Sequence, residues 1–137
     1  MGLADRIRGI QAKKQAAPAP HTDELVTYLI TTQQKFLLYL QQYKALFLAS
    51  DREAIISLSE RYARDLQEFR KKKDIYANRG GRHYMLYRVF SEEFAAVYEA
   101  VNYYINGKEK DVDKTLRPIV SALFALSQQD VPTALAA

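Results

Sequence analysis

The apolar residues of this chain recur at spacings of three and four through nearly its whole length, and this helical period constrains the fold most strongly. Five Gly and four Pro among 137 residues leave long uninterrupted windows for it. No window shows the alternation of apolar and polar residues that indicates a half-buried strand. The pattern predicts an all-α fold: an antiparallel bundle of about four core helices joined by short connections.

Capping residues and glycines predict the limits of the first two helices. Thr22 or Asp23 is suited to cap a first helix that continues to about residue 49. Ser50 is expected to cap the second helix, with Glu53 as its capping-box partner. The second helix is expected to continue to the double glycine of "NRGGR".

Two further helices complete the predicted bundle. One is expected to end where Asn106 or Gly107 takes the left-handed cap position. The other starts at about residue 111, and either begins near Arg117 or is kinked at Pro118, because proline lacks a backbone donor. Its apolar face is expected to contain Leu116, Ile119, Val120, Leu123 and Phe124. The core of the bundle is expected to include Phe36, Phe69, Leu86, Phe90 and Phe94.

The sequence divides into four parts. Residues 1–15 are predicted to form a separate amphipathic basic helix, residues 16–21 an Ala/Pro linker, residues 22–129 the helical bundle domain, and residues 130–137 a C-terminal tail without periodicity. The N-terminal helix has Leu3, Ile7 and Ile10 on one face, which predicts docking to a protein partner. Contact with a nucleic acid or with an anionic membrane surface stays open for it, as does an oligomer for the whole chain.

Several classes of protein are disfavoured by what the chain lacks. There is no Cys, so disulfides and thiolate metal sites are excluded. The apolar runs are far shorter than the roughly 20 residues of a membrane span. The charged N-terminus does not fit a secretory signal. A cytoplasmic protein without a membrane span is therefore expected.

Catalytic motifs are also missing. A phosphate-binding P-loop around Gly107 fails, because Asn102 and Glu109 occupy the places that need Gly and a hydroxyl residue. The two histidines, His21 and His83, do not have the spacings of a di-iron bundle or a zinc peptidase. The sequence predicts a protein that is not an enzyme, with no cofactor and no metal.

The most unusual segment is "FRKKKDIYANRGGRHYMLYR", residues 69–88. It contains seven Lys or Arg and one Asp, a net charge of +6, whereas the whole chain has +4. Part of this charge needs no functional role, because cations near a helix C-terminus are stabilised by the helix dipole. Arg79 and Arg82 differ, since they lie where the next helix begins and where further cations are disfavoured. Together with backbone N–H groups at a double glycine, they predict an anion site suited to phosphate.

Nucleic acid is the polyanion that this segment suits best. Tyr76, Tyr84 and Tyr87 would stack on bases beside the charged rim, or else belong to the core. His83 would add a pH-dependent donor, or is a plain surface residue. The predicted site comprises Arg70, Lys71, Lys72, Lys73, Arg79, Gly80, Gly81, Arg82, His83, Tyr84 and Arg88.

Two classes of function follow. The first is a non-enzymatic accessory subunit that binds nucleic acid, with single-stranded DNA or RNA favoured. "YANRGGR" followed by "FAAVYEAVNYYINGK" is similar to segments of the small helical subunit of type III CRISPR effector complexes, which lies along guide and target strands. That family has a further helix between the two segments, so no residue role is transferred from it. The second class is a protein-interaction or assembly module, such as an oligomeric adaptor or a virion or secretion component.

Overall fold

The all-α prediction is confirmed. A computed structural model describes residues 23–136, and these contain helices and no strand. The helices are α1 (Glu24–Leu48), α2 (Arg52–Arg70), α3 (Lys73–Arg79), α4 (Gly81–Ile105), α5 (Val112–Ser127) and α6 (Val131–Ala136). The predicted N-terminal helix with Leu3, Ile7 and Ile10 lies outside the described residues.

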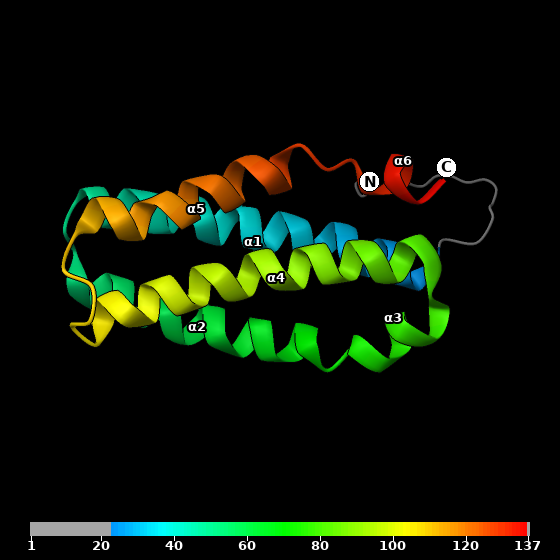
Figure 1. The fold of residues 1–137 in the computed structure, drawn as a ribbon, viewed down its shortest axis with the longest axis horizontal. Helices are drawn as coiled ribbons and strands as arrows, with labels where there is room; N and C mark the ends of the chain where they lie inside the picture. Colours follow the sequence, from blue (N-terminus) through cyan, green and yellow to red (C-terminus); the bar gives the residue numbers. More distant parts are fainter. Residues whose placement is uncertain (1–22, 137) are drawn as a thin grey trace, which may run out of the picture.

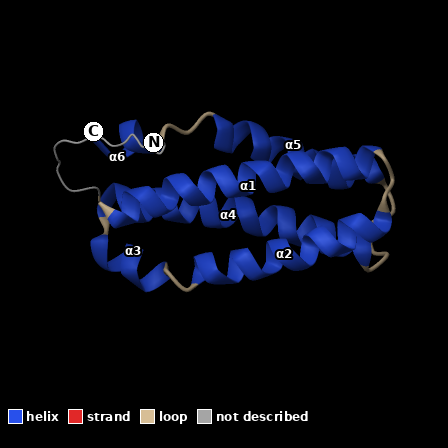
Figure 2. Cartoon of the chain, turned by 180° about the vertical axis from the view of Figure 1, so that it is seen from behind, coloured by secondary structure: helices blue, strands red, loops and turns tan. Residues whose placement is uncertain are grey.

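The helices lie along one long axis. In Figure 1, α1 runs from right to left, α2 and α3 return to the right, α4 runs left again and α5 returns. Helices α1 and α4 each contact both α2 and α5. These four helices therefore form a ring, in which the side between α1 and α5 is opposite the side between α2 and α4. Seen from behind in Figure 2, α3 extends α2 at the end of the molecule where α6 also lies.

An aromatic core fills the space between the helices. All five residues predicted for it are buried, namely Phe36, Phe69, Leu86, Phe90 and Phe94. The rings of Phe36 in α1 and Phe94 in α4 stack with centroids 3.9 Å apart. Burial of such rings supplies the main stabilisation between helices, since each removes on the order of 150 to 250 Å² from water.

The C-terminus of α1 is closed by a Schellman motif without glycine. The backbone N–H of Ser50 donates to the carbonyl of Phe47 at 3.2 Å, and that of Asp51 donates to the carbonyl of Leu46 at 3.1 Å. This motif places Ser50 in the left-handed region, with φ of 55°. Only glycine adopts this region without cost, so Ser50 is strained.

The start of α2 corrects the predicted cap. Asp51, and not Ser50, is the N-cap, and its side chain accepts from the N–H of Ala54 at 3.2 Å. Ser50 is unsuited to this role because it already ends α1. The predicted capping box between Ser50 and Glu53 is therefore wrong, whereas the predicted caps at Asp23 and Gly107 are confirmed.

The second predicted helix is interrupted before the double glycine. α2 ends at Arg70 and α3 begins at Lys73. The hydroxyl of Tyr87 donates to the carbonyl of Phe69 at 2.7 Å. In an unbroken helix this carbonyl would accept from the N–H of Lys73, so the tyrosine competes with the next turn. The chain then reverses at Gly80, whose φ of 70° and ψ of −166° form a combination that essentially only glycine adopts.

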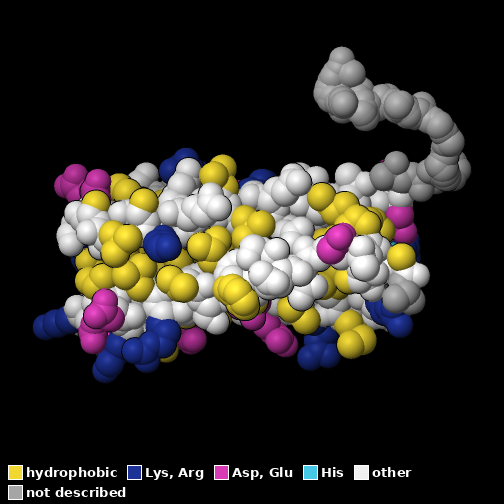
Figure 3. Space-filling view, turned by 90° about the horizontal axis from the view of Figure 1, so that it is seen from above, with side chains coloured by type: hydrophobic (Ala, Val, Ile, Leu, Met, Phe, Trp, Pro, Cys, Tyr) yellow, Lys and Arg dark blue, Asp and Glu magenta, His cyan; other side chains and the backbone are white. Residues whose placement is uncertain are grey.

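Helix α5 begins at Val112, in agreement with the predicted start at about residue 111, and contains Pro118, so the alternative start near Arg117 is wrong. Its apolar face differs from the prediction. Ile119 is buried as predicted, but Val120 is 44% exposed and Phe124 67% exposed. The buried positions of the helix are Thr115, Ile119, Ala122 and Leu126. Figure 3 views this side of the molecule and shows hydrophobic side chains spread over it.

The segment after α5 is held against α1 by one side chain. The Gln33 amide donates to the carbonyls of Leu126 and Gln129 at 2.7 and 2.8 Å. Residues 131–136, which were predicted to be part of a tail without periodicity, form α6 and bury Val131. The paired amide fixes where the chain leaves α5, and α6 then contacts α1 and α4.

Candidate functional site

A groove between α2 and α4 brings together four of the predicted site residues. Its first part is a hollow of about 500 Å³ where α2, α3 and α4 meet. The side chains that line it are Arg70, Lys73, Tyr84, Tyr87, Arg88, Ser91 and Glu92. Three cationic side chains and one carboxylate make this hollow basic.

The break between α2 and α3 positions two of the three cations. Arg70 is the last residue of α2 and Lys73 the first of α3, so both flank the interruption. Arg88 comes from the facing side of α4, with its guanidinium 5.8 Å from the ring centroid of Tyr84. Its Nη2 atom lies 3.8 Å from Oε2 of Glu92, a weak exposed ion pair. The cations thus surround the hollow from three helices.

The groove continues along α4. A second hollow of about 660 Å³ shares Arg70 and Glu92 with the first. It is also lined by Ala95, Ala96, Tyr98, Glu99, Asn102, Tyr103, Asn106 and Lys108. Its two carboxylates balance its two cations, so this part offers aromatic rings and amides without a net charge. At 1.5 Å per residue, the stretch from Tyr84 to Asn106 gives the whole groove a length of about 33 Å.

The three tyrosines of the basic segment have different roles. Tyr76 is fully buried and Tyr87 is 2% exposed, so the core alternative is right for both and stacking of these rings on bases is wrong. Their rings stack on each other with centroids 4.7 Å apart. Burial raises the pKa of Tyr87 to about 12, which keeps its hydroxyl protonated as a donor. Tyr84 is only partly buried and remains on the wall of the groove.

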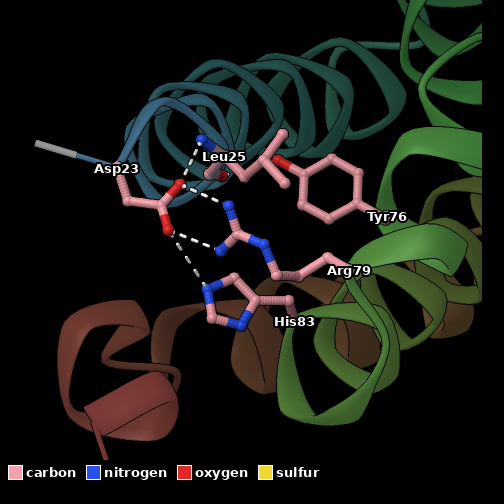
Figure 4. A network of polar contacts seen from close by, with 5 residues as sticks. All are labelled: Asp23, Leu25, Tyr76, Arg79 and His83. Atoms are coloured by element: carbon pink, nitrogen blue, oxygen red, sulfur yellow. Dashed lines mark hydrogen bonds and ion pairs between the residues drawn. The ribbon is translucent and has the colours of Figure 1, made fainter.

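Arg79 is exposed but is paired with a carboxylate of the same chain. Its guanidinium donates to both carboxylate oxygens of Asp23, with 3.2 Å between Nη2 and Oδ1 (Figure 4). Asp23 also accepts from the backbone N–H of Leu25 at 2.9 Å, and Nε2 of His83 lies 3.7 Å from Oδ2. The hydrogen bond from Arg79 lowers the pKa of Asp23, although desolvation opposes it. This network joins the start of α1 to α3 and α4.

The remaining predicted residues do not line the groove. Arg79 and His83 face Asp23 at the end of the molecule, and neither they nor Gly80, Gly81 and Arg82 contribute to either hollow. Lys71 pairs with Glu68 at 2.9 Å, and the Lys72 ammonium lies 5.2 Å from the ring centroid of Tyr28 on α1. The predicted residues therefore separate into a groove, a terminal network and other surface positions.

Sequence reasoning missed the part of the groove beyond Arg88. One row of α4 forms its wall at spacings of three and four, namely Tyr84, Arg88, Ser91, Ala95, Tyr98 and Asn102. These spacings keep residues on one helical face, so the row was visible as a polar and aromatic stripe beside the apolar one. What the sequence did not show is that this stripe faces α2.

The described residues offer neither a metal-binding cluster nor a membrane-spanning helix. Between residues 23 and 136, no group of three or more His, Cys, Asp or Glu side chains is placed to hold a metal ion. Over the same residues, the length and apolar character needed to cross a membrane occur together in no helix.

Comparison with known proteins gives no assignment. No protein-family model matches the chain, and neither curated proteins nor solved structures contain a significant match.

Proposed function

We propose that the chain binds single-stranded nucleic acid in the groove between α2 and α4, as a non-enzymatic accessory subunit. The observation that carries the proposal is the convergence of Arg70, Lys73 and Arg88 from three helices on one hollow. Phosphate groups are the ligands that suit such a set, because guanidinium groups pair with them in two parallel hydrogen bonds. No catalytic role is assigned to any of these side chains.

The shape of the groove favours a single strand. A duplex presents its phosphates on a convex surface and hides its bases, whereas a strand in a groove exposes both. Tyr84 beside the cations, and Tyr98 and Tyr103 further along, offer rings to unpaired bases. Stacking on such rings is worth about 1 to 3 kcal/mol per base. Asn102 and Asn106 supply amide donors and acceptors for base edges.

The two parts of the groove bind different parts of the nucleic acid. The basic part holds the sugar-phosphate backbone, and the electrically balanced part holds bases, where further phosphates would meet Glu92 and Glu99. With a length of about 33 Å, the groove accommodates at most about ten nucleotides at the 3.4 Å spacing of a stacked strand. We further propose that an antiparallel four-helix bundle in the cytoplasm serves as the scaffold for this groove.

A second candidate is a protein-interaction module that binds, in the same groove, a protein segment carrying both acidic and basic side chains. The observation that favours it is the presence of Glu92 and Glu99, since a protein partner offers cations to pair with them. Tyrosine and arginine are also enriched at protein interfaces. The prediction of a protein partner at Leu3, Ile7 and Ile10 lies outside the described residues and stays a prediction.

Fluorescence anisotropy with labelled single-stranded and double-stranded 12-mers of about equal charge per strand tests the proposal. We expect the single strand to bind more tightly, and its log affinity to fall with log salt at a slope of about 2. This slope corresponds to three phosphates at about 0.7 each. Equal affinity for both forms would contradict the single-strand specificity, and no binding at low salt would favour the protein-interaction candidate.

A further inference from the structure

A second surface, on the side of the molecule opposite the groove, is apolar. Leu38 and Leu48 of α1 are 56% and 67% exposed, and Val120 and Phe124 of α5 are 44% and 67% exposed. Figure 3 views this side, where most Lys, Arg, Asp and Glu side chains lie near the edges of the view. Single exposed hydrophobic residues are common, but a contiguous group of them marks an interaction surface.

The side chain of Gln33 shows which side of α1 faces α5. It donates to the carbonyls of Leu126 and Gln129, so the residues three before it and four after it, Ile30 and Leu37, are on the same side. The helical period then places one row of residues on this side of α1 and one on the adjacent side of α5. The row of α1 is Ile30, Gln34, Leu37, Gln41, Lys44 and Leu48, and the row of α5 is Leu116, Val120, Leu123 and Ser127. We call these two rows, together with Leu38 and Phe124, the α1–α5 face.

This face has almost no charge. Residues 118–129 contain no Asp, Glu, Lys or Arg, and residues 25–43 contain only Lys35. Lys35 is 3.8 Å from Asp65 of α2, so it lies on the other side of α1. Lys44 is the one charged residue in the two rows. Depletion of charge is the compositional mark of the centre of a protein interface.

We propose that the α1–α5 face is the contact between two copies of this chain in a two-fold symmetric dimer. In such a contact each residue meets the same patch on the other copy. A patch with a row of like charges would repel itself, whereas this face has a single charge at Lys44 and otherwise consists of aliphatic residues, Phe124, Ser127 and the amides of Gln34 and Gln41. An amide both donates and accepts, so it pairs with its own symmetry copy. The face is thus complementary to itself.

The size of the face fits a reversible dimer. Helix α5 has 16 residues and is about 24 Å long, and two packed helices are roughly 20 Å wide. The footprint is about 500 Å² per copy, somewhat below the roughly 800 Å² per partner of a standard stable interface. Dissociation in the micromolar range is therefore expected. Because the groove between α2 and α4 is on the opposite side, both copies keep it open, and the dimer does not depend on the ligand of the groove.

Sedimentation of the full chain over about 1 to 200 µM, without nucleic acid, tests this proposal. We expect the mass to rise from that of the 15.7 kDa chain toward twice that value. Phe124→Glu should weaken the dimer at least about tenfold, since it puts two carboxylates, one from each copy, into an apolar interface. Met85→Glu is the matched control, because Met85 is also 67% exposed but belongs to α4, outside the face. Leu38→Glu provides a second disrupting variant, on α1.

Two results would overturn the proposal. A monomer at every concentration would exclude the dimer, and so would a dimer that Phe124→Glu and Leu38→Glu leave intact. If the chain is monomeric, hydrogen exchange of α1 and α5 before and after removal of residues 1–15 identifies the other occupant. Loss of protection would show that the chain's own N-terminal segment covers the face, and unchanged rapid exchange would leave the face to a different protein.

Discussion

Replacing Gln33 should destabilise the protein although the side chain belongs to neither the aromatic core nor the groove. Its amide donates two hydrogen bonds, one to the carbonyl of Leu126 in the last turn of α5 and one to that of Gln129 just beyond it, and these hold the α5–α6 connection on α1. Each such bond contributes about 0.5 to 1.5 kcal/mol net. Gln33→Met keeps the volume and removes both donors. The carbonyl of Leu126 still accepts from the N–H of Gln129 at 3.2 Å, so little extra penalty arises there.

The expected loss is therefore about 2 kcal/mol in the free energy of unfolding, or about 6 to 10 °C in Tm for a domain of this size. Urea denaturation followed by circular dichroism measures it, with an unchanged dependence on urea if the folded state stays compact. Gln42→Met is the control, because Gln42 is an exposed residue of the same helix and should change stability by less than about 0.5 kcal/mol. A Gln33 variant as stable as wild type would refute the role of the two bonds.

Three further changes follow from particular contacts. Ser50→Gly should raise stability by about 1 kcal/mol in urea denaturation, because φ at this position is 55° and glycine removes the left-handed strain; a loss of stability would contradict it. Asp23→Asn should lower stability at about pH 6, and the difference from wild type should shrink as the pH falls below 3.8. The pKa of Asp23 is lowered from the ordinary 3.8, so its stabilisation is present above that value and is lost as the pH falls through the folded-state pKa; a difference independent of pH would count against the pairing with Arg79. Glu92→Gln should tighten binding of single strands about threefold or more in anisotropy, since it removes the carboxylate of the basic hollow and releases Arg88; weaker binding would show that Glu92 contacts the ligand favourably.

The helical content and the core were predictable because both depend on local spacing. A period of 3.6 residues is imposed wherever a helix packs on one side, so the buried phenylalanines at positions such as Phe36 and Phe94 follow from the sequence alone. The caps at Asp23 and Gly107 are also local, since an acceptor side chain or a glycine identifies them.

Contacts between distant residues limited the rest of the prediction. Arg79 pairs with Asp23, which is 56 positions away, and no local pattern indicates this pair. At the α2–α3 interruption the carbonyl of Phe69 accepts from the hydroxyl of Tyr87, which is 18 positions further along the chain. In α5, two overlapping apolar rows both fit a helix, and only packing decides that Phe124 is outside.

The groove was predictable only where its residues lie close together in the sequence. Arg70, Lys73, Tyr84 and Arg88 lie within a short segment, so their high charge density marks them in the sequence. Tyr98 and Asn102 lie outside that segment and carry no charge, and they belong to the groove only because α2 packs beside their row of α4.

The most direct test of the groove compares two variants with equal loss of charge on binding to a single-stranded 12-mer. Arg70→Gln with Arg88→Gln removes two of the three cations of the basic hollow, whereas Arg61→Gln with Arg64→Gln removes two exposed arginines of α2 that do not line it. We expect the first pair to reduce the salt slope by about 1.4 and to weaken binding at least about tenfold, and the second pair to change affinity by less than about threefold. Equal losses in both variants would mean that net charge alone attracts the strand, and the groove would not be the binding site.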